Sequence, residues 1–163
     1  MENLQVIKQR FGIIGQSPLL DRALGTAIRV ANTDLSVLIA GESGVGKEIF
    51  SKIIHALSAR KHNKFIAINC GAIPEGTINS ELFGHEKGAF TGAETDRKGL
   101  LAAADEDTLF LDEVGDISRD LQRLLIRAVE EKSYFPLGSE IPEKSDFRLL
   151  TATNIDEVEL RQR

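Results

Sequence analysis

The sequence contains a single cysteine, Cys70, among 163 residues. One cysteine excludes an internal disulfide, and such scarcity is typical of proteins in a reducing cytoplasm. Long hydrophobic runs are also lacking, since no apolar stretch approaches the roughly 20 residues that a membrane helix requires. Residues 1–5 do not show the basic-then-apolar order of a secretion signal. These absences predict a cytoplasmic protein with no membrane segment.

Basic residues are in the minority, with 20 Lys and Arg against 25 Asp and Glu, for a formal net charge of -5 and a pI near 5.3. This balance argues against a general nucleic-acid-binding surface, and we identify no DNA-binding domain. The histidines His55, His62 and His85 are scattered, and no Cys/His pair supports a zinc site. Length and composition, with 42% hydrophobic and 28% charged residues, predict one globular domain.

A glycine-rich loop is the most informative stretch that is present. It follows the apolar run 37–40 and precedes a helical pattern at 49–57, which is the context of a phosphate-binding loop. Glycines let the backbone aim N–H groups at an anion, the following helix adds its positive dipole end, and the lysine adds a mobile charge. The alternative is a glycine-rich turn without a ligand. The predicted nucleotide-binding residues are Gly41, Glu42, Ser43, Gly44, Val45, Gly46, Lys47 and Glu48.

Strand and helix patterns alternate along the rest of the chain. Apolar strand patterns occur at 36–40, 65–70, 108–113 and 147–152, and helical patterns occur at 18–31, 49–57, 78–83, 100–104 and 121–129. We expect 60–64 to be a solvated connection, 134–145 to be a hairpin or loop, and a polar helix to begin after Asn154. The alternation predicts an α/β fold with a parallel, doubly wound sheet.

Polar side chains collect at the predicted strand ends. The carboxyl ends of parallel strands share one edge of a sheet, so Asn69, Asp112, Glu113 and Asn154 should lie near the phosphate loop. Asp112 would hold Mg²⁺, with Glu48 as a second and longer-armed ligand. Glu113 would polarise the attacking water, and Asn154 would position that water or sense the γ-phosphate. The alternative for the two carboxylates is a solvated strand end.

A second glycine-flanked stretch has one aromatic residue at its centre. It comprises Gly88, Ala89, Phe90, Thr91, Gly92 and Ala93. Composition leaves two interpretations open, a turn that ends a helix and a mobile loop that offers Phe90 and Thr91 to a partner.

Together, the segments 41–48, 69–70, 81–93 and 108–113 resemble the central AAA+ domain of bacterial sigma-54-dependent transcription activators, the enhancer-binding proteins. The resemblance runs from about residue 11 to residue 154, with the motifs in order, and the hexapeptide GAFTGA at 88–93 is nearly diagnostic. A glutamate in the position of Glu48 is usual in that family. The resemblance implies a three-layer P-loop NTPase fold over 11–163, with 1–10 as an N-terminal extension.

The resemblance also implies roles for individual residues. Ile14 and Gly15 would lie against the adenine of ATP, and Asn69 would be a switch that restrains Glu113. Phe90 and Thr91 would contact sigma-54 in the RNA polymerase holoenzyme, and 138–144 would form a second inserted hairpin beside that loop. Family members act as hexameric rings that hydrolyse ATP, with Mg²⁺, to remodel closed promoter complexes.

Some parts of the family pattern are not found. The trans-acting arginine fingers lie beyond this segment in the family, and Arg161 and Arg163 should not be given that role. The last strand and the helical lid are also not found, so we expect 37–40 to form an unpaired sheet edge. The alternative function is therefore a truncated module that binds nucleotide or sigma factor without turnover, and we expect weak ATP binding and poor hydrolysis. A purely structural α/β domain would leave both motifs unexplained.

Overall fold

The computed structural model describes residues 4–13, 18–41, 45–154 and 159–162. Its centre is a five-stranded sheet in which the strands β1, β2, β3 and β6 are parallel, as predicted. The order across the sheet is β2 (Phe65–Asn69), β3 (Thr108–Asp112), β6 (Arg148–Asn154), β1 (Val37–Gly41) and β7 (Glu159–Gln162).

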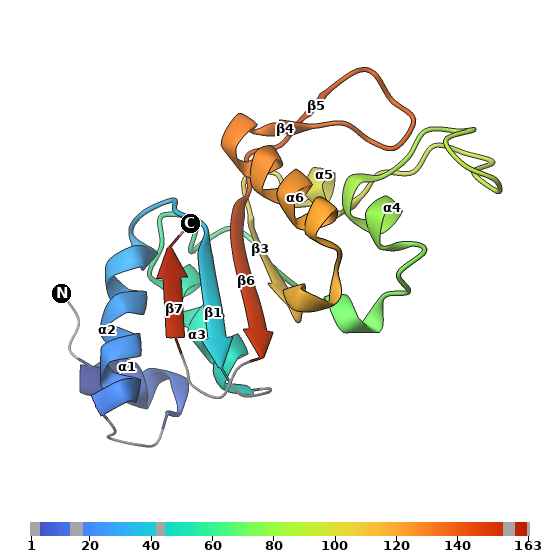
Figure 1. Ribbon diagram of the computed structural model, residues 1–163. Coiled ribbons are helices and arrows are strands. Elements are labelled where there is room, and N and C mark those ends of the chain that lie inside the picture. Colours follow the sequence, from blue (N-terminus) through green and yellow to red (C-terminus); the bar gives the residue numbers. More distant parts are fainter. Residues whose placement is uncertain (1–3, 14–17, 42–44, 155–158, 163) are drawn as a thin grey trace.

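Helices cover both faces of this sheet (Figure 1). Within β3, Leu109 and Leu111 belong to one core, whereas Phe110 belongs to the core on the opposite face. This alternation explains why a strand that is apolar throughout needs cover on both sides. The first core includes α4 (Ile78–Phe83), α5 (Leu100–Ala103) and α6 (Arg119–Glu131), and the second includes α1 (Leu4–Phe11), α2 (Pro18–Ala31) and α3 (Val45–Ala56). The expected three-layer arrangement is confirmed.

Two short helices and a hairpin complete the described part. The 3-10 helices η1 (Cys70–Ala72) and η2 (Val114–Asp116) follow directly after β2 and β3. The strands β4 (Ser133–Tyr134) and β5 (Glu143–Lys144) pair antiparallel, so the predicted insertion at 134–145 is a hairpin. No helix in the described residues has both the length and the apolar character needed to cross a membrane.

Helix α1 packs against the domain although we predict residues 1–10 to be an extension. Ile7 is fully buried in the core beneath α2 and α3. Lys8 Nζ lies 2.5 Å from Asp21 Oδ1 on α2. The segment is thus anchored by both apolar packing and an ion pair, while the domain boundary after residue 10 stays a prediction.

The sheet edge beside β1 differs from our expectation. We expected 37–40 to be unpaired and a helix to begin after Asn154, but β7 pairs antiparallel with β1, with Val37 opposite Gln162 and Ala40 opposite Glu159. An exposed apolar edge presents a row of unpaired N–H and C=O groups, and an extended segment can satisfy them at once. A short polar helix gains less, because helix nucleation is unfavourable. The expectation of an unpaired edge was therefore wrong, and 159–162 are a strand and not a helix, while 155–158, where that helix was expected to begin, lie outside the described residues.

Residues 61–64 are exposed, as expected of a solvated connection, but the Arg60 side chain before them is mostly buried. Its guanidinium donates to the backbone carbonyls of Asp107 and Asp146, at 3.2 and 2.8 Å. It also pairs with the carboxylates of Asp34 and Asp146, at 3.0 and 2.8 Å. These partners come from three different loops at the amino edge of the sheet, so Arg60 joins those loops together.

His55 on α3 is buried and forms hydrogen bonds through both ring nitrogens. Nε2 lies 3.0 Å from the Asn63 carbonyl, which can only accept, so Nε2 carries the proton and Nδ1 accepts from the Thr108 hydroxyl at 2.8 Å. The neutral ring fits this pattern, and burial lowers the pKa of His55 below its ordinary value of 6.5. This histidine is a structural residue, because both of its ring nitrogens are engaged within the fold.

This arrangement predicts acid sensitivity. Because the folded pKa lies below the unfolded one, the unfolded chain binds more protons between the two values. The contribution of His55 to stability is complete above about pH 6.5 and is lost as pH falls through the lowered folded pKa. We expect the urea midpoint to fall more between pH 7.5 and pH 5.5 in the wild type than in His55→Gln. Equal falls in the two proteins would contradict this assignment.

Candidate functional site

The predicted site residues end four strands at one edge of the sheet. Gly41 at the end of β1 pairs with Asn154 at the end of β6, and Asn69 at the end of β2 pairs with Asp112 at the end of β3. The parallel register therefore gathers them, as the strand-end argument predicts.

Lys47 lies at the centre of this edge. It is in the first turn of α3 and its side chain is almost completely buried, at 1% exposure. Its ammonium donates to the carbonyls of Gly41 and Thr153, at 3.3 and 3.4 Å, and to Asn154 Oδ1. All three acceptors are uncharged, so these contacts hold the ammonium in place without neutralising its charge. An anion at this edge would meet a positioned cation at the start of a helix.

Glu113 follows β3 with its backbone in the left-handed region, at φ 55° and ψ 44°. Its N–H donates to Asp112 Oδ1 at 2.8 Å, which closes a tight turn at the end of the strand. A non-glycine residue in this conformation is strained by roughly 1–2 kcal/mol, and such strain is often found at functional sites. The turn re-aims the Glu113 side chain from the strand direction toward β2.

Gly71 is where the Glu113 and Asn69 side chains meet. A methyl group in place of the Gly71 hydrogen would lie 2.1 Å from Glu113 Oε2 and 3.2 Å from Asn69 Oδ1. Asn69 Oδ1 also accepts a hydrogen bond from the Gly71 N–H at 2.8 Å. The same methyl group would lie 2.9 Å from Asp116 Oδ2. The structure thus brings Asn69 and Glu113 together, as the family resemblance implies.

Gly71 and Asp116 were not predicted from the sequence as site residues. Asp116 is the third carboxylate in the stretch 112–116, and Gly71 follows the strand-ending Asn69 by two residues. Those two signals were available, but only the fold shows that the residues converge.

The hexapeptide at 88–93 lies on a loop that leaves the domain through a narrow neck. Helix α4 ends at Phe83, five residues before Gly88, so the interpretation as a helix-ending turn was wrong and this segment is a loop. At the neck, a methyl group on Gly84 would lie 2.5 Å from the Arg97 carbonyl oxygen and 2.8 Å from Gly99 N. Figure 1 shows the loop extending away from the sheet.

The tip of the loop is a closed turn, and the second hairpin lies beside it. Gly88 N donates to the Ala93 carbonyl at 2.8 Å. Phe90 is 46% exposed at this turn. A methyl group on Gly138 would lie 2.8 Å from the Ala89 Cβ, so the hairpin touches the hexapeptide. The predicted placement of 138–144 next to the loop is confirmed.

Comparison with known proteins identifies the family. Residues 13–163 match the family described as the Sigma-54 interaction domain. The chain belongs to this family. The transcriptional regulatory protein GlrR of Escherichia coli (strain K12) is 51% identical over 147 residues, which cover 90% of this chain and 33% of GlrR. The Nif-specific regulatory protein of Bradyrhizobium diazoefficiens is 49% identical over 146 residues, which cover 90% of this chain and 25% of that protein. This sigma-54 interaction domain therefore spans a third or less of these relatives.

Solved structures agree with the fold. NtrX from Brucella abortus, crystallised in complex with ATP, is 30% identical with a TM-score of 0.74, and the match covers 88% of this chain and 30% of NtrX. The P-loop NTPase domain of a sigma-54 transport activator from E. coli has a TM-score of 0.54 at 15% identity, and the match covers 85% of this chain and 78% of that one. The second likeness is one of fold alone.

Several predicted residues of this sigma-54 interaction domain lie outside the described residues. They are Ile14, Gly15, Glu42, Ser43 and Gly44. Glu48 is described, and its half-exposed carboxylate lies 3.9 Å from Lys52 Nζ one turn along α3. In the described ranges, no group of three or more His, Cys, Asp and Glu side chains is arranged to hold a metal ion. Mg²⁺ coordination by Asp112 and Glu48 stays a prediction.

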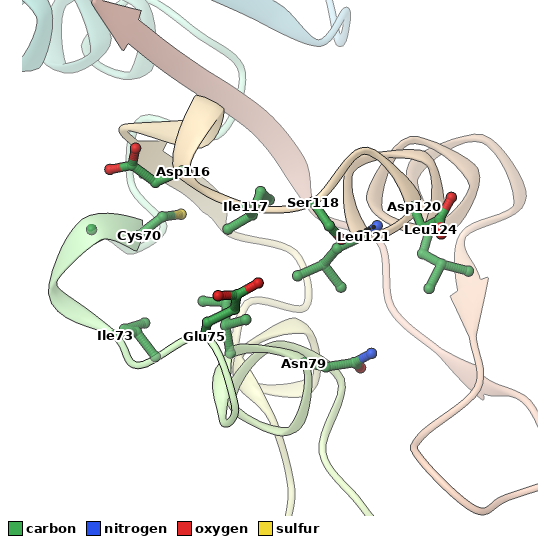
Figure 2. A pocket seen from close by; sticks show the side chains of 12 residues that line it. Cys70, Ile73, Glu75, Asn79, Asp116, Ile117, Ser118, Asp120, Leu121 and Leu124 are labelled. Atoms are coloured by element: carbon green, nitrogen blue, oxygen red, sulfur yellow. Dashed lines mark hydrogen bonds between the residues drawn. The ribbon is translucent and has the colours of Figure 1, made fainter.

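A cavity of about 500 Å³ lies beside the Glu113 turn of the sigma-54 interaction domain, between the segment after β2 and the start of α6. Figure 2 shows Cys70 and Asp116 at one end, with Leu121 and Leu124 of α6 at the other. Burial, together with the nearby carboxylates of Asp112, Asp116 and Glu113, raises the pKa of Cys70 to about 11. The thiol is therefore protonated at neutral pH, which confirms its interpretation as a packed apolar residue.

Proposed function

We propose that this chain binds ATP at the carboxyl edge of the sheet and, in the parent protein, hydrolyses it to act on sigma-54 RNA polymerase. The buried Lys47 ammonium, held by Gly41, Thr153 and Asn154, carries the proposal. The glycine loop 41–46 would wrap the phosphates, and Ile14 and Gly15 would contact the adenine. The ATP complex of the related NtrX supports nucleotide as the ligand class.

Each polar group at this edge has a proposed task. Lys47 exchanges its Asn154 contact for phosphate oxygens, because an ammonium pairs more strongly with an anion than with an amide. Glu113 accepts a proton from the attacking water, and Asn69, which faces it across Gly71, restrains it beforehand. Asn154, once released by Lys47, positions the water or senses the γ-phosphate. One oxygen of Asp112 accepts from the Glu113 N–H, and its other oxygen would hold Mg²⁺, with Glu48 as a second ligand.

Bound Mg²⁺ would neutralise charge on the phosphates. The donor set fits this ion, since Mg²⁺ in nucleotide sites takes one or two carboxylates together with phosphate oxygens and water.

The partner follows from the family. A sigma-54 interaction domain implies sigma-54 as its partner, and we propose that the hexapeptide loop, Gly88 to Ala93, makes the contact. Half-exposed Phe90 at the tip is an aromatic side chain, a type that is enriched at protein interfaces. We further propose that the parent protein is a cytoplasmic ring hexamer and that ATP turnover drives promoter opening.

A second candidate is a binding module without turnover. The chain spans only a third of GlrR, so groups that complete an ATPase site can lie in other segments or subunits. The two candidates agree on nucleotide binding and differ on hydrolysis.

ATP turnover across a protein concentration series, with sizing by light scattering, separates the two candidates. If this chain completes the ATPase site by itself, the wild type binds ATP, and turnover rises from the poor level expected of the isolated chain as it self-associates. Glu113→Gln should then lower turnover by about 100-fold, because it removes the general base while keeping the side-chain shape.

ATP binding without Glu113-dependent turnover at any concentration would establish the binding module. No ATP binding at all would refute both candidates.

A further inference from the structure

His85 is fixed at the base of the hexapeptide loop by backbone pairing on both sides. Its N–H donates to the Arg97 carbonyl at 2.9 Å, and the Arg97 N–H donates back at 2.7 Å. On the other side, the Leu137 N–H donates to the Gly84 carbonyl and the Glu86 N–H donates to the Leu137 carbonyl, both at 3.0 Å. His85 therefore sits in a three-segment ladder that ties the loop to the second hairpin.

The His85 side chain is held as well. Its Nδ1 lies 2.5 Å from the hydroxyl of Ser80, a buried residue one turn before the end of α4. This contact orients the imidazole ring from the helix side. The Glu81–Arg97 ion pair, at 2.9 Å, lies at the same neck but involves neither the His85 ring nor the Phe90 ring.

The oriented imidazole meets Phe90. The two ring centroids lie 4.9 Å apart, and the ring planes make an angle of 73°. This is the edge-to-face geometry that aromatic pairs favour. Phe90 is thus half-covered, with one side of its ring committed to the base of its own loop.

We propose that His85 is a positioning residue that holds the Phe90 ring against the base of the loop. A partner must then separate Phe90 from the imidazole before it can bind the Phe90 ring. This inference rests on the proposed contact between Phe90 and sigma-54. In the unbound loop, Phe90 pairs with His85, and the hydrogen bond from Ser80 orients the His85 ring for this contact. A partner that binds the Phe90 ring therefore competes with His85 for that ring.

The size of the effect follows from the strength of aromatic pairs. Such a pair shifts an equilibrium by about 2- to 12-fold. If only the released state binds, the apparent dissociation constant is the intrinsic one divided by the released fraction. Removing the imidazole should therefore tighten binding of sigma-54 by about 2- to 10-fold.

The first test uses the free chain and needs no partner. In protein carrying ¹³C-labelled phenylalanine, with the Phe90 signal assigned through Phe90→Leu, we expect nuclear Overhauser contacts between the Phe90 and His85 rings. His85→Ala should shift the Phe90 signal toward a solvent-exposed value and increase its mobility. His85→Phe should restore the ring contact, and Ser80→Ala should weaken it. Arg97→Ala, the matched control at the neck, should leave Phe90 unchanged.

The second test measures the affinity of the same variants for purified sigma-54. Tighter binding by His85→Ala and Ser80→Ala, with wild-type affinity for His85→Phe and Arg97→Ala, is the expected pattern. A Phe90 signal unaffected by His85→Ala, or weaker binding by that variant, would overturn the proposal. If the wild type does not bind sigma-54, the proposed partner contact is refuted. The Phe90 NMR signals of the free chain then decide by themselves whether His85 holds the Phe90 ring.

Discussion

Replacing Lys47 with alanine should weaken ATP binding by about 1,000-fold, on the order of 4 kcal/mol, while leaving the fold intact. The structure holds the ammonium at the meeting point of β1 and β6. The substitution would remove the charge-assisted bonds that we propose between this ammonium and the phosphates of ATP. Two of the three contacts that Lys47 would lose, those to Thr153 and Asn154, are only partly buried, so water can replace the ammonium there. Calorimetric titration with ATP and thermal unfolding of the same samples would measure both expectations.

Lys61→Ala is the matched control for this experiment. It removes the same charge from a loop at the opposite edge of the sheet, between α3 and β2. We expect its ATP affinity to equal that of the wild type. Equal affinity in Lys47→Ala and Lys61→Ala would show that the nucleotide, if it binds, does not use this edge.

Arg148→Met should destabilise the chain by about 3 kcal/mol, because it leaves buried carbonyl groups without donors. Arg148 is 1% exposed at the start of β6, and its guanidinium donates to the carbonyls of Val30, Ala31 and Leu35 at 2.7, 2.8 and 3.2 Å. Burial lowers the pKa of Arg148 to about 10, so it remains charged at neutral pH. The substitution also removes the desolvation cost of the buried Arg148 charge, and this offsets part of the stability lost with its three hydrogen bonds.

Arg123→Met is the matched control, because it removes an arginine that makes no buried hydrogen bond to any described residue. Comparing the urea unfolding of Arg148→Met and Arg123→Met separates the loss of the buried Arg148 hydrogen bonds from a general effect of removing an arginine. Arg123 is 77% exposed on α6 and pairs with Asp120 at 3.5 Å, a surface contact that contributes less than about 0.5 kcal/mol. Arg148→Lys, with fewer and differently placed donors, should fall between the wild type and Arg148→Met. If Arg148→Met and Arg123→Met unfold at the same urea concentration, Arg148 does not anchor the end of α2.

The strand ends show how far local pattern reaches. Asn69, Asp112 and Asn154 were placed at one sheet edge from apolar runs and turn residues alone, and the register confirms that placement. This succeeded because parallel strands connected by helices put their carboxyl ends together whatever the details of packing. The phosphate loop was found for the same reason, since its spacing and its strand-to-helix setting are local.

The errors and omissions have a different origin. β7 carries no strand pattern of its own, and it forms only because β1 offers a free edge next to it. Arg60 was assigned to a solvated loop because its partners, Asp34, Asp107 and Asp146, are 26 to 86 residues away. Such contacts depend on which loops the folded sheet brings together at its amino edge. A pattern of neighbouring residues in the sequence does not contain that information.

The sequence by itself therefore determined the fold class, the strand ends and the family motifs, all of which rest on spacings within a few residues. Only the tertiary structure decided that Lys47 meets Asn154, that Glu113 faces Asn69 across Gly71, and that His85 covers Phe90. The first two join segments that are distant in sequence, so they exist only once the sheet register is set. The third depends on the neck that bends the chain back on itself, because His85 and Phe90 would not face each other in an extended or helical segment.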